Sequence, residues 1–120
     1  MSGTRSRLPL EKETHIVHGI LEYLRMLGIT AWRQNTGAAQ LRAAGGRTQF
    51  VRFGFPGLSD ILGILPDGKF LAIEVKRPGG VVSQAQEDFL AEVHRLNAVG
   101  FVAYQPDDVD RELRARGYLK

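Results

Sequence analysis

A carboxylate and an amine stand two residues apart in Phe70–Lys76, whose sequence FLAIEVK is typical of a β-strand. Because side chains alternate between the two faces of a strand, Glu74 and Lys76 point to one face and Val75 points to the other. An isolated pair of this kind is most often an exposed ion pair. Any chemistry at Glu74 therefore depends on what the neighbouring strand places beside it.

The turn that precedes this strand brings a second carboxylate alongside. Residues 65–69 (LPDGK) match a three-residue hairpin loop, a type I turn followed by glycine in the left-handed region. A loop of this length sets Asp60 directly opposite Glu74, with Cβ atoms about 5 Å apart. A two-residue loop would instead set Asp60 opposite Val75, on the wrong face. We therefore predict two carboxylates side by side, with Lys76 next to them.

Two carboxylates directly opposed on a sheet repel each other, so the pair requires a compensating partner. Mg²⁺ or a similar divalent ion such as Mn²⁺ prefers carboxylate and carbonyl oxygens. Such an ion lowers the pKa of a bound water and stabilises charge that develops on a phosphodiester. Lys76 could then orient the attacking water, act as its base or hold a phosphate oxygen. The alternatives to a cation are a protonated carboxyl or an ion pair with Lys76.

Two polar residues on expected helices could join this pair. Glu13 lies in line with the apolar stripe of the first helix, so its side chain should lean toward the sheet. A first-turn acid favoured by the helix dipole is the rival explanation for Glu13. Gln86 belongs to the S-x-x-Q sequence that starts at Ser83, a capping box that accounts for it structurally. An amide in the first turn of a helix could nevertheless also touch the metal site or Lys76.

The elements that must position these residues follow from the apolar patterns. We expect helices from Pro9 to Gly28, from Ser83 to about Ala98 and over Asp107–Arg116, and strands over Ile29–Arg33, Leu58–Leu65, Phe70–Lys76 and Phe101–Gln105. The second helix offers Phe89, Leu90, Val93 and Leu96 for burial. The segment 38–53, with Gly45-Gly46 at its centre, forms either a hairpin or a mobile loop. This order predicts an α/β protein with a mixed sheet flanked by helices.

The composition bounds the remaining possibilities. The chain has 120 residues, enough for one domain over residues 9–120 after a loose basic tail at 1–8. It has no cysteine, which excludes disulfides, thiolate zinc sites and cysteine nucleophiles. Its apolar stretches are too short to span a bilayer, and it has no phosphate-loop motif for a nucleotide. The net charge is +3, and no acidic residue lies between Glu22 and Asp60, a segment with five arginines. This segment suits a polyanionic partner.

Taken together, several motifs resemble a known family. They are Glu13, W-R-x-N-x-G at 32–37, Gly57-x-x-Asp60, Glu74-x-Lys76 and Ser83-x-x-Gln86. Over about residues 10–105 the chain is similar to the VRR-NUC (virus-type replication-repair nuclease) domain of the PD-(D/E)XK nuclease superfamily. The resemblance implies a restriction-endonuclease-like core of order αβββαβ, here with an inserted hairpin and a C-terminal helix.

The resemblance also implies roles for individual residues. Asp60, Glu74, the Val75 carbonyl and Glu13 would bind the metal, Lys76 would be the catalytic lysine, and Gln86 would be the glutamine that follows the core strands. Ser59 departs from the pattern, because it stands where the superfamily name places proline. That proline shapes the strand and takes no part in acid–base chemistry, so the departure affects the motif more than the chemistry.

Stand-alone members of this family are associated with phage or bacterial DNA processing and with homo-oligomers that act on four-way junctions. We therefore expect a Mg²⁺- or Mn²⁺-dependent DNA endonuclease selective for branched DNA. It would act as a homodimer or a dimer of dimers in the cytoplasm of a bacterium or a phage-infected cell. Candidate phosphate contacts are Arg42, Arg47, Arg52 and Arg77. The rival hypotheses are a non-catalytic branched-DNA-binding protein of the same fold, and a structural or interaction protein with another acidic partner.

Overall fold

The computed structural model describes residues 12–34 and 56–120 with their side chains, and the backbone of 9–11, 38–42 and 48–52. The elements follow the predicted order: α1 (Pro9–Met26), β1 (Thr30–Arg33), β2 (Ala38–Arg42), β3 (Thr48–Arg52), β4 (Ile61–Ile64), β5 (Phe70–Val75), α2 (Gln84–Arg95), β6 (Val99–Ala103) and α3 (Pro106–Ala115). The expected tail at 1–8 and the centre of the hairpin at Gly45-Gly46 lie outside the described residues.

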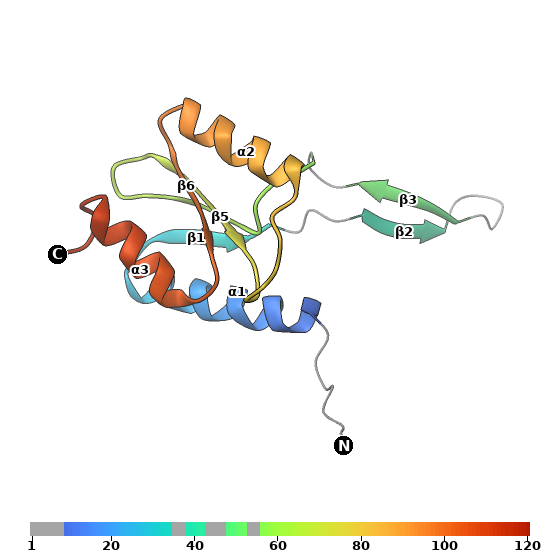
Figure 1. The fold of residues 1–120 in the computed structure, drawn as a ribbon, viewed down its shortest axis with the longest axis horizontal. Coiled ribbons are helices and arrows are strands. Elements are labelled where there is room, and N and C mark those ends of the chain that lie inside the picture. Colours follow the sequence, from blue (N-terminus) through green and yellow to red (C-terminus); the bar gives the residue numbers. More distant parts are fainter. Residues whose placement is uncertain (1–8, 35–37, 43–47, 53–55) are drawn as a thin grey trace, which may run out of the picture.

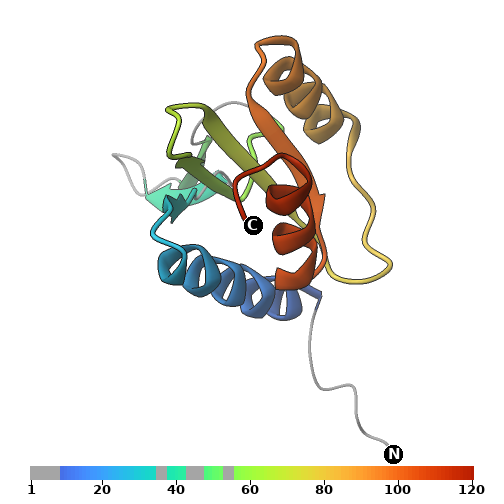
Figure 2. The same cartoon turned by 90° about the vertical axis from the view of Figure 1, so that its left-hand side faces the viewer.

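A four-stranded mixed sheet of order β1-β4-β5-β6 forms the centre of the molecule. The pairs β1–β4 and β4–β5 are antiparallel, and β5–β6 is parallel. Helices α1 and α3 cover one face of the sheet and α2 covers the other (Figures 1 and 2). This arrangement confirms the predicted mixed sheet flanked by helices and is compatible with a restriction-endonuclease-like core. Strands β2 and β3 pair antiparallel in a separate two-stranded sheet, as predicted for the hairpin.

The turn between β4 and β5 has the predicted geometry. The Leu65 N–H donates to the Lys69 carbonyl at 2.9 Å, and the Gly68 N–H donates to the Leu65 carbonyl at 2.8 Å. Gly68 has φ +90°, the left-handed conformation that the loop requires. The strands then pair from Ile64 with Phe70 to Ile61 with Ile73. The predicted register of this hairpin is therefore confirmed.

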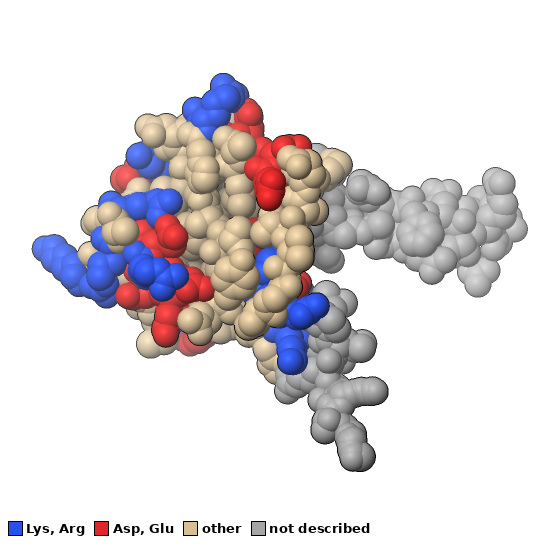
Figure 3. All heavy atoms as spheres, in the orientation of Figure 1, with Lys and Arg blue, Asp and Glu red and all other residues tan. Residues whose placement is uncertain are grey.

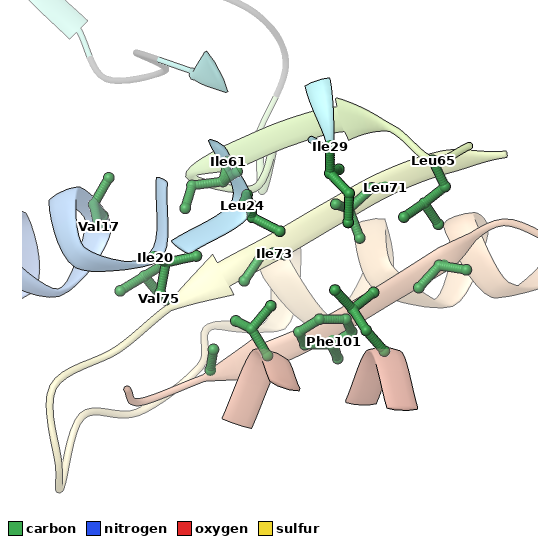
Figure 4. Close-up of a cluster of buried hydrophobic side chains, with 14 residues drawn as sticks. Val17, Ile20, Leu24, Ile29, Ile61, Leu65, Leu71, Ile73, Val75 and Phe101 are labelled. Carbon is green, nitrogen blue, oxygen red and sulfur yellow. The ribbon is translucent and has the colours of Figure 1, made fainter. Parts of the chain in front are cut away.

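The side chains of β5 divide between two cores, as their alternation predicts. Leu71, Ile73 and Val75 are fully buried on the face that packs against α1 and α3 (Figure 4). Ala72 is fully buried on the opposite face, beneath Leu90 of α2. Glu74 shares that second face with Ala72, so α2 covers the carboxylate.

Several element boundaries differ from those predicted by one to three residues. Strand β4 begins at Ile61, three residues after the expected start, and β6 begins two residues early, at Val99. Helix α2 ends at Arg95, before the expected end, because Asn97 adopts the left-handed conformation with φ +65°. Leu96 consequently lies past the last turn and is 62% exposed, so its expected burial is wrong. No helix in the described part of the chain is long and apolar enough to cross a membrane.

Candidate active site

Asp60 lies at the edge of the sheet where β4 begins and β1 and β5 end. Its Oδ2 accepts a hydrogen bond of 2.8 Å from the Val75 N–H. Its carbonyl accepts one of 2.7 Å from the Gln34 N–H, which continues the β1–β4 pairing by one step. Two neighbouring strands therefore position this residue, although Asp60 itself stands one residue outside β4.

Glu74 is the most deeply buried charged residue of the described part, with 1% of its surface exposed. Its Oε2 accepts a hydrogen bond of 2.7 Å from Gln86 Nε2 and lies 3.6 Å from Lys76 Nζ. Its Oε1 is buried and has no hydrogen-bond partner among the described residues. Gln86 and Lys76 thus hold Oε2, whereas Oε1 receives no hydrogen bond from a described residue.

Gln86 combines the two roles between which the sequence could not decide. Its Oε1 accepts from the Ser83 N–H at 2.8 Å, and its own N–H donates to Ser83 Oγ at 3.2 Å, which completes the capping box at the start of α2. Because Oε1 accepts from this donor, the amide nitrogen must point the other way, toward Glu74. The cap of α2 therefore fixes the orientation of the amide that holds Glu74.

The electrostatics of the pair call for a positive partner. Burial of the Glu74 carboxyl, then the charge of Asp60 beside it and the hydrogen bond that the protonated Glu74 carboxyl makes with Asp60, raise the pKa of Glu74 to about 8, although Lys76 opposes the rise. Either a proton or a cation must therefore offset the charges of the two carboxylates. A hard divalent cation fits these residues, because Glu74 Oε1 is a buried oxygen without a partner.

The Val75 carbonyl is oriented toward the side of β5 where a cation between Asp60 and Glu74 would lie. The N–H and C=O of one residue in an extended strand point to the same side. The Val75 N–H points to Asp60, whereas the Lys76 N–H points away from it and donates to the Ala103 carbonyl at 3.0 Å. The carbonyl of Val75 is therefore on the Asp60 side of β5.

Lys76 lies where the strand alternation predicts, on the face of Glu74. Its side chain is 14% exposed, and its amine pairs with Glu74 Oε2. This places an amine beside two carboxylates at a partly open edge of the sheet. Such a group can donate to a water or to a phosphate oxygen that approaches from solvent.

Glu13 leans toward the sheet as predicted, but its carboxylate contacts the main chain of Arg77 and not the Asp60–Glu74 pair. Its Oε2 accepts from the Arg77 N–H at 3.5 Å, and the side chain is half-buried. Among the described residues, no group of three or more acids or histidines is arranged to hold a metal. The structure therefore brings Asp60 and Glu74 together, whereas Glu13 contacts the residue that follows Lys76.

Of the arginines predicted to contact phosphate, only Arg77 has a described side chain. Arg77 follows Lys76 directly and is half-buried. The side chains of Arg42, Arg47 and Arg52 lie outside the described residues, as do Asn35 and Gly37 of the W-R-x-N-x-G run. Ser59 is fully buried, and its Oγ has no partner among the described residues.

Gly57 opens the Gly57-x-x-Asp60 motif, and its role becomes visible in the structure. It has φ +83°, and a Cβ there would lie 2.0 Å from the Ala85 carbonyl oxygen. Only glycine therefore allows the segment before Asp60 to pack against the first turn of α2. The run F-P-G ahead of a strand was the available signal, since glycine after proline is typical of a turn with positive φ.

Comparison with known proteins identifies a family for the chain. A family model described as the VRR-NUC domain matches residues 14–104, a range that contains Asp60, Glu74, Lys76 and Gln86 and begins one residue after Glu13. No curated protein and no solved structure matches the chain. Since the family match covers most of the chain, the chain belongs to the VRR-NUC family of nucleases.

Proposed function

We propose that this protein is a Mg²⁺- or Mn²⁺-dependent DNA endonuclease with Asp60 and Glu74 at its metal site. The observation that carries the proposal is the buried Glu74 Oε1, which has no partner in the described structure and lies in a carboxylate pair beside Lys76. Membership of a nuclease family supports hydrolysis of a phosphodiester as the reaction.

Asp60, Glu74 and the Val75 carbonyl would hold the cation, with Glu13 as the fourth residue that the family resemblance suggests. When bound, a divalent ion supplies a water of lowered pKa and stabilises the charge that develops on the phosphate. Gln86 holds Glu74 Oε2, so that Oε1 is the oxygen left for the cation. The Val75 N–H holds one oxygen of Asp60 in the same way.

Lys76 is the residue we assign to the reacting phosphate or the attacking water. Its amine is ion-paired with Glu74 and partly exposed. A charged amine donates hydrogen bonds and accepts none. These contacts support orientation of the water or binding of a phosphate oxygen over the role of a general base.

We further propose that the enzyme is selective for branched DNA and acts as a homodimer or a dimer of dimers in the cytoplasm of a bacterium or a phage-infected cell. One chain supplies one such acidic pair within its described residues, and two symmetric cuts in a junction need two sites. A two-fold assembly supplies them most simply. Light scattering of the protein bound to a junction should give an even number of chains, and a monomer on the junction would contradict this part.

The chemistry is tested by incubating the protein with labelled four-way junction, flap and linear duplex DNA in Mg²⁺, in Mn²⁺ and in EDTA. We expect cleavage with either metal, preference for the branched substrates, and no cleavage in EDTA or by the Asp60→Asn and Lys76→Ala variants. Binding without metal-dependent cleavage would instead identify a non-catalytic DNA-binding protein. Cleavage by Lys76→Ala at the wild-type rate would show that the activity belongs to another site.

A further inference from the structure

Most arginines with described side chains are neutralised by a nearby acid on, or at the end of, the same helix. The pairs are Arg25–Glu22, Arg95–Glu92, Arg111–Asp108, Arg114–Asp110 and Arg116–Glu112, at spacings of three or four residues. Figure 3 shows this mixing of blue and red over α3. Within the described residues, Arg33 and Arg77 are the arginines without an ion pair. Arg33 ends β1 and Arg77 follows β5 by two residues, so both stand at the end of the sheet where Asp60 and Glu74 lie, and both segments contact α1.

Arg33 is the last residue of β1 and stands opposite Ile61, the neighbour of Asp60. It is exposed, and its Nη2 donates to Thr14 Oγ1 at 3.5 Å. The contact with Thr14 holds the guanidinium near α1 at the edge of the sheet where the acidic pair lies.

Arg77 reaches the same edge from β5. It follows Lys76, and its N–H donates to Glu13 Oε2 at 3.5 Å. Because Glu13 and Thr14 are adjacent on α1, the segments that carry Arg33 and Arg77 meet the same turn of that helix. One arginine therefore approaches the edge from β1 and the other from β5, with the start of β4 and Asp60 between these strands.

We propose that Arg33 and Arg77 each bind a backbone phosphate of the DNA at the end of the sheet that carries Asp60 and Glu74, on the side of α1. A guanidinium presents a planar fork of N–H donors that matches phosphate oxygens, and no carboxylate among the described residues forms an ion pair with either arginine. The inference rests on the proposed function, because it takes DNA as the substrate. It adds Arg33, and it separates these two cations from those that are already neutralised.

Lys69 offers a matched control. It is an exposed cation in the β4–β5 turn, at the opposite end of the sheet, and it also lacks an ion pair within the described residues. Its replacement by alanine removes the same charge as either arginine replacement. A change that depended on net charge alone would therefore be the same in Lys69→Ala.

The test measures binding of a labelled linear duplex by fluorescence anisotropy in EDTA, between 50 and 200 mM salt. Each phosphate contact contributes about 0.9 to the slope of log K against log salt concentration. The fourfold rise in salt lowers the affinity of wild type for DNA by a certain factor. For Arg33→Ala or Arg77→Ala that factor should be about 3.5 times smaller, and for the double variant about 12 times smaller. Lys69→Ala should retain the wild-type slope, as should Arg33→Lys.

An unchanged slope in both arginine variants would overturn the proposal, as would an equal loss of slope in Lys69→Ala. Thermal unfolding of each variant shows whether it is folded. If an alanine variant is not, Arg33→Gln or Arg77→Gln takes its place, because glutamine also removes the charge but keeps a polar side chain, and the same loss of slope is expected. Cleavage is measured separately in Mn²⁺. Reduced slopes without cleavage would contradict the proposed chemistry alone, whereas cleavage with unchanged slopes would contradict the phosphate contacts alone.

Discussion

Replacement of Glu74 by glutamine should stabilise the metal-free protein, by an amount that grows with pH. Burial and the charge of Asp60 raise the pKa of Glu74 from its ordinary 4.5 to about 8. Between these values the unfolded chain has released the proton and the folded chain retains it. The folded state then binds more protons than the unfolded state, so the free energy of unfolding falls as pH rises from 4.5 to 8. A glutamine at this position does not titrate and avoids that loss.

The size of the effect follows from the two pKa values. Each pKa unit corresponds to about 1.4 kcal/mol, so the destabilisation by Glu74 reaches about 3 kcal/mol at pH 7 and about 5 kcal/mol above pH 8. The side chain is 1% exposed, which leaves little solvent screening to reduce these values. Near pH 5 the protonated carboxyl and the amide should be nearly equivalent.

Urea unfolding in EDTA at half-unit steps from pH 5 to pH 9 measures this difference. Glu87→Gln makes the same chemical change on an exposed part of α2 and should follow wild type across the range. At pH 8, saturating Mn²⁺ should raise the free energy of unfolding of wild type substantially. It should raise that of Glu74→Gln only slightly, because a ligand stabilises only a folded state that binds it. Parallel curves for wild type and Glu74→Gln in EDTA would refute the reasoning.

Three further variants test other contacts of the site. Lys76→Met should lower kcat by about 100-fold or more with little change in the Kd for DNA, and wild-type turnover would remove the lysine from the chemistry. Gln86→Met should weaken Mn²⁺ binding about 10- to 100-fold in calorimetry while α2 stays folded, because the Ser83 Oγ cap remains; unchanged affinity would mean that Glu74 needs no such donor. Gly57→Ala should lower the free energy of unfolding by about 2 kcal/mol or more, since its Cβ would meet the Ala85 carbonyl, and an unchanged urea midpoint would contradict this.

The placement of Asp60 beside Glu74 could be predicted because it depends on local chemistry. The LPDGK turn admits one loop length, and that length sets the register of the two strands. The apolar alternation in β5 likewise sets which side chains face α2. Both features are determined by residues that are close in sequence.

The contacts that depend on tertiary packing could not be predicted in the same way. The capping box at Ser83 was visible, but whether Gln86 also reaches Glu74 depends on how α2 lies across β5. The hydrogen bond from the Arg77 N–H to Glu13 depends in turn on how α1 packs against the end of β5. Helical periodicity places a residue on a face, and a shift of one turn decides which partner it meets.

Crystals grown or soaked in Mn²⁺ test the central claim most directly, because the anomalous signal locates the ion. We predict a peak bonded to Glu74 Oε1 and to Asp60, with Glu74 Oε2 still held by Gln86, and no peak in Asp60→Asn crystals treated in the same way. A fully occupied Mn²⁺ elsewhere in the molecule, with no density between these two carboxylates, would contradict the account.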